Sequence, residues 1–374
     1  MNIFKYLLKK TTDRGTKMKR KFFYIFVLAI TSFILVNAQS VMDYTRKTLE
    51  MCYSVIIPSL FPFFVCSGLL IYSGFAQTLS KICGFIMRPL FNVAPAGAAA
   101  FVLGIISGFP LGAICAKDLY KAGNLSKPEA ERLLAFCNNS GPLFIIGTVG
   151  TAIYLSPLYG IMMYIIHIIS SVIVGILFRF YGKNRHNSPP TNINTAELAL
   201  PRVITTALES ASKNILTVCF SIVFFSSLAQ AVLDVFPLSD TVNAILSGIC
   251  EFSTGILKIS VLDEDLMKKL VMSAFIIGFS GLTVHLQVIA ATANSGLSLK
   301  PYILGKCLHG IIAAVITYVV LIIADVRPIF SQNPYPLSQS FAVSASGLII
   351  AMVTLVVFSG LIYRCYKKKR QLMT

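Results

Sequence analysis

Charged residues are scarce in this chain: Asp, Glu, Lys and Arg make up only 13% of its 374 residues, whereas hydrophobic residues make up 56%. The mean hydropathy is +0.77. A soluble protein of this length could not bury so much apolar surface, so the composition indicates a polytopic membrane protein. The apolar runs are continuous and do not alternate with polar residues, which favours an all-α membrane protein over a β-barrel.

Acidic residues are also few, 15 against 32 Lys and Arg, which gives a net charge of +17. Most of this excess lies in residues 1–21, 179–202 and 364–370, and each of these stretches flanks an apolar span. That is the positive-inside pattern, which predicts a cytoplasmic N-terminus, central loop and C-terminal tail. No motif that reads RNA or DNA accompanies the charge, so we expect a lipid bilayer and no nucleic acid as partner.

Several chemical signatures are absent. The nine cysteines contain no CxxC pair and lie mostly in apolar runs, which predicts reduced packing residues and no metal site. No HExxH, GxSxG or paired-Asp motif occurs in the apolar spans, so we expect neither an enzyme nor a cofactor.

Apolar segments and basic stretches divide the chain into two membrane halves. The predicted parts are, in order, a basic cytoplasmic extension (1–21), a first membrane repeat (22–181), a cytoplasmic linker (182–202), a second membrane repeat (203–325), a C-terminal transmembrane helix (342–363) and a basic cytoplasmic tail (364–374). Val36-Asn37-Ala38 is compatible with a signal-peptidase site and Met18 with an alternative start. We favour an uncleaved first helix over residues 22–38, because many spans follow it.

Inside the two halves the apolar runs differ in length. The expected elements are a kinked span at 52–72, an interfacial helix at 76–92, an apolar run with a break at 97–116, a polar segment at 117–132 with a solvated Lys117-Asp118 pair, a re-entrant segment at 142–154, a span at 160–181, a long helix at 204–233, an apolar segment at 241–258, an interrupted segment at 270–292 and a span at 302–324. Residues 142–154 are too few to cross a bilayer, which needs ~20 residues.

Two of these apolar segments are interrupted by glycine in a similar way. One alignment places Ser107-Gly108 over Ser280-Gly281, Gly123 over Gly296, and Lys127-Pro128 over Lys300-Pro301. Two copies of an interrupted apolar segment are the best sequence indication of the binding site of a transporter.

A second alignment competes with the first. It places Phe109 and Gly112 over Phe252 and Gly255, and Ser140-Gly141 over Ser280-Gly281. Both alignments predict two related repeats with interrupted or re-entrant helices, and the sequence leaves the choice open.

The breaks themselves are candidate binding residues. Ser107, Gly108, Ser280 and Gly281 would each end one half-helix and begin another, and the exposed N–H groups at a half-helix N-terminus attract anions. The alternative is close helix packing at small residues. Next to the short apolar segment, Asn138, Asn139 and Ser140 would bind a polar ligand or cap the next helix.

Glu251 is the sharpest isolated polar residue. A carboxylate in a membrane segment is costly and indicates coupling, gating or ligand contact, unless the helix lies at the membrane surface. His285, Gln287 and His309 are polar groups of the second half, and His285 is a second candidate for coupling or gating. His167 is predicted to be structural.

Four stretches carry a resemblance to a known family: SGFPLGA, the following KAGNLSKPEAERLLAFCNNSGPLFIIGTVG, and the later CEFSTG and SGLTVHLQ. In these the chain resembles the YlbJ family of sporulation integral membrane proteins, whose sequences carry the "nucleoside recognition" or gate domain. The resemblance extends over nearly the whole chain from about residue 40, and CNNSGP with the preceding ERLLAF is its most specific part.

The resemblance implies a protein of the outer forespore membrane of a spore-forming bacterium, with an architecture similar to concentrative nucleoside transporters. It implies transport of dipicolinic acid, a small planar aromatic dianion, from the mother cell to the spore. The alternatives are a nucleoside-type transporter, a non-transporting scaffold for spore cortex assembly, and a membrane enzyme acting on lipid-linked precursors. The oligomeric state, a homo-oligomer included, stays open.

Overall fold

A computed structural model describes residues 21–73, 75–182 and 200–323. The predicted extension (1–20), the middle of the linker (183–199), the helix 342–363 and the basic tail lie outside the described residues. Within the described ranges every regular element is a helix. The prediction of an all-α protein is confirmed.

Four helices of the described part are long and apolar enough to cross a membrane: Pro157–Phe178, Leu200–Leu233, Leu266–Ala291 and Lys300–Ile323. A fifth span is added if the helix Lys21–Val36 and the segment Ala38–Ser54 count as one, although they are bent by 91°. The protein is therefore an integral, multi-pass membrane protein.

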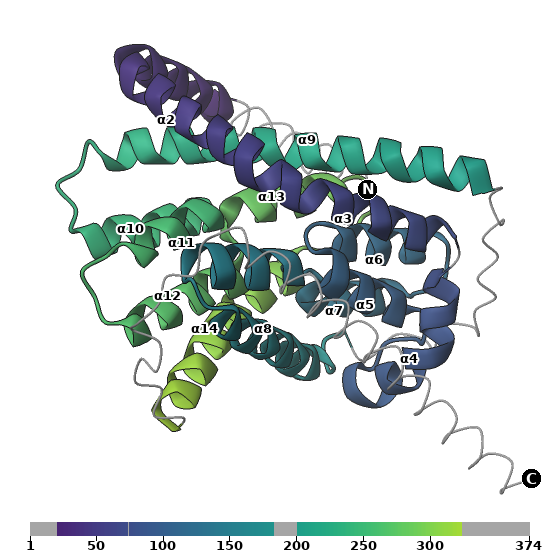
Figure 1. Cartoon of the computed structure of the whole chain (residues 1–374). Coiled ribbons are helices and arrows are strands. Elements are labelled where there is room, and N and C mark those ends of the chain that lie inside the picture. Colours follow the sequence, from purple (N-terminus) through teal and green to yellow (C-terminus); the bar gives the residue numbers. More distant parts are fainter. Residues whose placement is uncertain (1–20, 74, 183–199, 324–374) are drawn as a thin grey trace, which may run out of the picture.

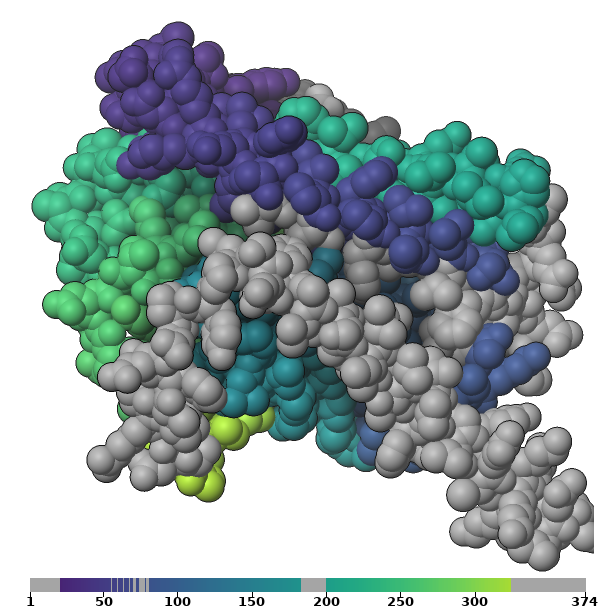
Figure 2. Space-filling model, viewed as in Figure 1, coloured from purple at the N-terminus to yellow at the C-terminus, as the bar shows by residue number. Residues whose placement is uncertain are grey.

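Two long arms lie across one side of the molecule. The first arm consists of α2 (Ala38–Met51), the π-helical turn η1 (Cys52–Ile56) and α3 (Ile57–Tyr72), and the second is α9 (Leu200–Leu233). They run antiparallel, since the Tyr44 hydroxyl bonds to Asp234 near one end and Gly68 packs on Ala207 near the other. Figure 1 shows both arms above the remaining helices, and Figure 2 shows the purple N-terminal helices on the outside of the molecule.

The rest of the first half is a series of short helices and one long one: α4 (Phe75–Phe91), α5 (Gly97–Ser107), α6 (Leu111–Lys121), α7 (Lys127–Cys137), the π-helix η2 (Leu143–Ile153) and α8 (Pro157–Phe178). The 11 residues of α5 extend about 16 Å, only half of a bilayer core. The chain breaks after Ser107 and folds back, so that Gly104 of α5 lies against Gly112 of α6. The predicted break in 97–116 is thus a helical hairpin.

The segment 117–132 is different from the expected polar loop. Lys117 and Asp118 form an ion pair on α6, with nitrogen and oxygen 3.2 Å apart. The next helix, α7, begins with a capping box of Ser126 and Glu129 and is buried over most of its length. Its charged side chains find partners on other elements: Arg132 donates to the carbonyl of Tyr181 at 2.7 Å. Tertiary hydrogen bonds therefore bury a stretch that is polar in the sequence.

The second half continues after its arm with α10 (Asp240–Cys250), α11 (Phe252–Ser260), α12 (Leu266–Phe279), α13 (Gly281–Ala291) and α14 (Lys300–Ile323). The apolar segment 241–258 is broken at Glu251, and Gly248 of α10 lies against Gly255 of α11. The predicted interruption in 270–292 occurs at Ser280, which has a left-handed backbone with φ +77°. In the acidic loop Asp263-Glu264-Asp265, which precedes α12, the amide of Lys268 donates to Asp265 at 2.8 Å and lowers the pKa of that carboxyl.

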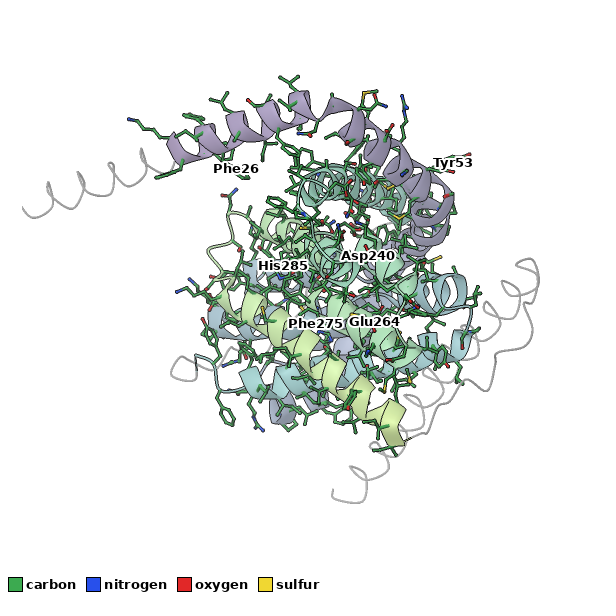
Figure 3. All side chains as sticks on the ribbon, turned by 90° about the vertical axis from the view of Figure 1, so that its left-hand side faces the viewer. Phe26, Tyr53, Asp240, Glu264, Phe275 and His285 are labelled. Atoms are coloured by element: carbon green, nitrogen blue, oxygen red, sulfur yellow. The ribbon has the colours of Figure 1, made fainter. Side chains whose placement is uncertain are left out.

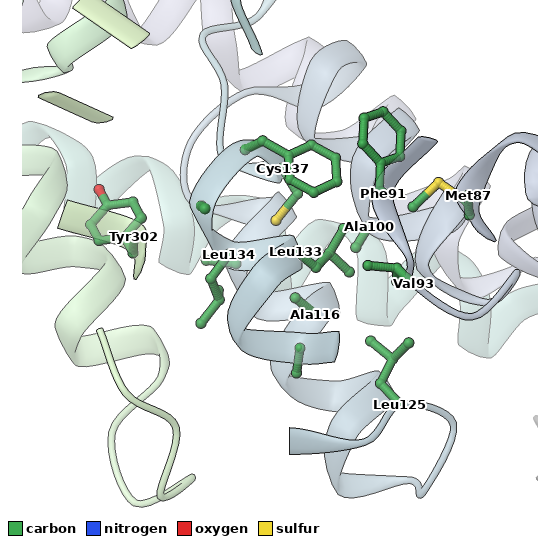
Figure 4. Packing of buried hydrophobic residues seen from close by; sticks show 14 of the residues in the cluster. Met87, Phe91, Val93, Ala100, Ala116, Leu125, Leu133, Leu134, Cys137 and Tyr302 are labelled. Atoms are coloured by element: carbon green, nitrogen blue, oxygen red, sulfur yellow. The ribbon is translucent and has the colours of Figure 1, made fainter. Parts of the chain in front are cut away.

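The first-half core surrounds α7. Figure 4 shows Phe91, Leu133 and Cys137 among its buried side chains, and Tyr302 of α14 reaches it from the second half. Gly305 of α14 packs directly on the backbone of Ala135, so the two helices approach as closely as their backbones allow. The two halves of the protein are therefore packed against each other through α7 and α14.

Candidate functional site

The breaks of the short helices come together in the middle of the described structure. In the first half Gly108, with φ +80°, lies so close to Gly141 that a Cβ would be 3.0 Å from the Gly141 nitrogen. In the second half Gly281, with φ +70°, lies equally close to the nitrogen of Phe252. Only glycine adopts these conformations without strain, and it leaves room for the neighbouring backbone. In each half, the two helix breaks therefore contact one another at a glycine.

Aromatic rings join these two contacts. The Phe252 ring lies 5.8 Å from that of Phe109 and 4.8 Å from that of Phe144, measured between ring centroids. Both partners of Phe252 belong to the first half. The four breaks therefore meet at one place between the halves.

A small cavity of about 40 Å³ lies at this place. The arms cover it with Ile56, Leu60 and Phe64 of the first arm and Val218 and Ile222 of α9. Its polar lining consists of neutral side chains: Ser107, Ser140, Ser253, Thr283 and Gln287. A buried polar surface at this depth of an apolar protein is a candidate binding site.

The predicted residues of the first half lie at the cavity or directly behind it. Ser107 lines it, and its buried hydroxyl has no hydrogen-bond partner among the described residues. Ser140 lines it as well, and its amide donates to Nε2 of His167 at 3.2 Å. The side-chain Nδ2 of Asn139 donates to the carbonyl of Phe136 at 2.9 Å, while the side-chain oxygen of Asn139 has no partner among the described residues. Asn138 lies beside the Tyr302 hydroxyl without a hydrogen bond of ordinary geometry.

None of these three residues caps the next helix, because the N-cap of η2 is Pro142 and no side chain caps this helix. The capping alternative is therefore wrong for Asn138, Asn139 and Ser140. Their polar atoms are buried, and several of them are left for another partner.

In the second half, Ser280 and Gly281 form the break but do not line the cavity. The buried Ser280 hydroxyl donates back to the carbonyl of Ile277 at 3.3 Å. The lining comes from the next turn, where the Thr283 hydroxyl donates to the carbonyl of Cys250 at 3.0 Å. Thr283 and Gln287 are thus the cavity residues that α13 contributes.

Glu251 is fully buried, so the alternative of an interfacial position is wrong. Its carboxyl group caps α11 and accepts from the amide of Ser253 at 3.1 Å, the Ser253 hydroxyl at 2.6 Å and the amide of Thr254 at 2.7 Å. The N-terminus of α11 is therefore occupied by a carboxyl group of the protein itself.

His285 lies among the helices, as Figure 3 shows, whereas Tyr53 projects outward from the first arm. Nδ1 of His285 contacts the carbonyl of Gly281 at 2.7 Å, and the His285 ring contacts those of Phe279 and Tyr302. Its Nε2 is buried without a partner among the described residues. His285 contacts the break at Gly281 but not the cavity.

The sequence analysis did not predict two clusters of buried polar side chains. One joins Lys306 and His309 of α14 to His167 of α8, whose ring lies 4.3 Å from that of His309. The other lies between α9 and α11, where Ser226 bonds to Thr254 at 2.9 Å and Gln230 is buried with both amide atoms unpartnered. A lone lysine in the apolar run 302–324 was the available signal for the first cluster.

No group of three or more His, Cys, Asp or Glu in the described ranges could hold a metal ion. Broken helices that meet at a buried polar cavity define the class of this protein: it is an all-helical, multi-pass integral membrane protein with interrupted helices. No family model matches the chain, and no solved structure matches it.

The chain is a homologue of the sporulation integral membrane protein YlbJ of Bacillus subtilis (strain 168). The two are 29% identical over 326 residues, which cover 78% of this chain and 80% of the relative. The predicted resemblance is confirmed, and the protein is related to a sporulation protein.

Proposed function

We propose that this protein transports a small carboxylate-bearing solute, dipicolinic acid, from the mother cell across the outer forespore membrane during sporulation. The observation that carries the proposal is the meeting of four helix breaks at one buried cavity, whose mostly apolar lining includes five neutral polar side chains. Irregular backbone at membrane depth occurs where it is buried in protein or lines a watery cavity. The relative's name supports the sporulation context.

The proposal includes two related halves. Apart from α4, which has no counterpart among the described helices of the second half, each half has an arm, a hairpin of short helices, a broken helix and a closing helix, in the same order. This order supports the alignment that places Phe109 over Phe252 and Ser140-Gly141 over Ser280-Gly281. His167 and His309, on the closing helices α8 and α14, then correspond as well and touch each other. Paired halves that meet at a central site are the usual plan of secondary transporters.

The solute needs more room than the cavity offers. About 40 Å³ holds about three water molecules, whereas pockets for small ligands measure several hundred Å³. We therefore assign this structure to a closed state. Since both arms cover the cavity, movement of α3 and α9 relative to the hairpins would open it.

The lining suits dipicolinate in two ways. The rings of Phe109, Phe144 and Phe252 surround the cavity and can contact the faces of a planar aromatic solute. Hydroxyl and amide groups, including the unpartnered hydroxyl of Ser107, can donate hydrogen bonds to carboxylates.

A nucleoside is the second candidate solute, because each of the five polar side chains of the lining is uncharged. Uptake of labelled nucleoside would identify it. A scaffold for cortex assembly predicts normal spores when Ser107 or Asn139 is changed and the protein level is kept. We propose that the protein is no enzyme, since the lining offers hydroxyls and amides but no acid or base.

The test is the dipicolinate content of spores and of the mother cell in a deletion strain complemented with variants. We expect the deletion to leave dipicolinate in the mother cell, and Ser107→Ala and Asn139→Ala to lower spore dipicolinate several-fold. The Ser107 hydroxyl has no hydrogen-bond partner among the described residues, so its loss costs the fold little.

Ser171→Ala is the matched control. It removes a buried hydroxyl that donates to the carbonyl of Phe136 at 2.8 Å outside the cavity, which costs about 1 kcal/mol of stability. We expect full spore dipicolinate with this variant. Normal spore dipicolinate in the deletion strain would refute the transport function and favour the scaffold.

A further inference from the structure

Lys306 lies within α14 and is buried, with an exposed fraction of only 1%. Its Nζ donates to the carbonyl of Asn138 at 3.2 Å and lies 3.3 Å from Nδ1 of His309. It also lies 5.4 Å from the centroid of the Phe109 ring. No described carboxylate forms an ion pair with it.

Hydrogen-bond directions determine how the neighbouring histidines are protonated. Nε2 of His309 contacts the carbonyl of His167 at 3.0 Å, and a carbonyl can only accept, so this nitrogen carries a hydrogen. In the neutral ring Nδ1 is then an acceptor, and Lys306 donates to it. Nε2 of His167 accepts from the amide of Ser140, so Lys306 is connected to the backbone at the cavity through the ring of His309 and then the backbone and ring of His167.

In the described part of the chain, no negatively charged side chain balances the charge of Lys306. The titratable groups that face it are Cys137 of α7, His167 of α8, His285 of α13 and His309 of α14 itself. Helix α12 approaches α14 through the backbone of Gly278, against Gly310. A charged amine buried without a counter-ion is costly, so the empty site disfavours a positive charge at this position.

An anion in the cavity would remove that cost. Lys306 contacts the Phe109 ring and the Asn138 carbonyl, and both Phe109 and nearby Ser140 line the cavity. The amine therefore lies directly behind the first-half wall, within the range over which charges interact strongly in a dry interior.

We propose that Lys306 is the charge-compensating group of the site: its amine takes up one proton when an anionic solute enters the cavity and releases that proton when the solute leaves. The neutral amine and a proton from water give the ammonium ion, which His309 and the Asn138 carbonyl hold by hydrogen bonds. Solute binding is thereby coupled to protonation. This inference rests on the proposed function, because it requires a solute that carries negative charge.

The test is calorimetry of dipicolinate binding to the purified full-length protein, in two buffers that differ in ionisation enthalpy, which counts the protons taken up. We expect about one proton per solute in the wild type. For Lys306→Met we expect binding at least about tenfold weaker and no proton uptake. Lys306→Arg keeps a permanent charge, so proton uptake should disappear even where binding remains.

Lys258→Met is the matched control. Lys258 is a half-buried lysine of the same half that donates to Asn243 at 2.6 Å and does not line the cavity. We expect it to bind dipicolinate and take up protons like the wild type. Undiminished proton uptake in both Lys306→Arg and Lys306→Met would overturn the role of Lys306 while leaving dipicolinate binding intact. No dipicolinate binding by the folded wild type would refute the proposed function, and this inference with it.

Discussion

Gly104→Ala is expected to prevent the protein from reaching a stable fold. A methyl group on Gly104 would overlap the carbonyl oxygen of Cys137, and the opposite face of the hairpin, at Gly112, is equally close to that oxygen. The end of α7 therefore fits between the two short helices only where both residues lack a side chain. Because a backbone atom and not a flexible side chain is in the way, we expect a loss of about 3 kcal/mol or more.

The measurement is the yield of monodisperse protein from membranes and its thermal unfolding temperature in detergent. Gly147→Ala is the control within the same half, because its new Cβ would meet only Leu143, at an ordinary 3.4 Å. We expect the control to match the wild type. Equal stability of both variants would contradict the close packing of α7 against the hairpin.

Glu251→Ala is expected to abolish transport and to lower stability. The substitution removes the acceptor of three hydrogen bonds at the break between α10 and α11, and leaves the amides of Ser253 and Thr254 buried without partners. Each unmade bond of this kind costs about 1–3 kcal/mol. Since Phe252 and Ser253 both belong to the cavity wall, a loosened break also disturbs the site.

Glu251→Gln separates the two effects, because one of its amide atoms is still an acceptor. Its stability should lie between those of Glu251→Ala and the wild type. Asp265→Ala is the control: Asp265 caps α12 at an exposed loop, so its loss costs about 1 kcal/mol and leaves transport unchanged. Thermal unfolding measures the stability of these variants, and spore dipicolinate measures their transport. Full transport by Glu251→Ala would contradict a role of the Glu251 cap in the site.

The broken helices could be predicted because their signals are local. A glycine next to a serine inside an apolar run, as at Ser107-Gly108 and Ser280-Gly281, marks a place where a membrane helix ends. The short segment 142–154 was also expected to be too short for a span, and the structure has an 11-residue π-helix within it. Length and hydropathy therefore sufficed for the class of fold.

Features that depend on partners from the other half could not be predicted. The charges of α7 look solvated in the sequence, but Glu131 accepts from the amide of Ser298, far along the chain, at 2.8 Å. No glycine or proline stands at the break between α10 and α11. The hydrogen bonds that the Glu251 side chain accepts explain why the helix breaks there. Lys306 was visible as a lone charge in an apolar run, but its connection to His167 required the folded structure.

The most direct test of the central claim is uptake of labelled dipicolinate by proteoliposomes that contain the purified protein. We predict saturable uptake by the wild type, uptake reduced several-fold by Ser107→Ala, and full uptake by Ser171→Ala. Labelled nucleoside should not be taken up, and empty liposomes give the background. Dipicolinate uptake no faster than in empty liposomes, with folded protein in the membrane, would contradict the account.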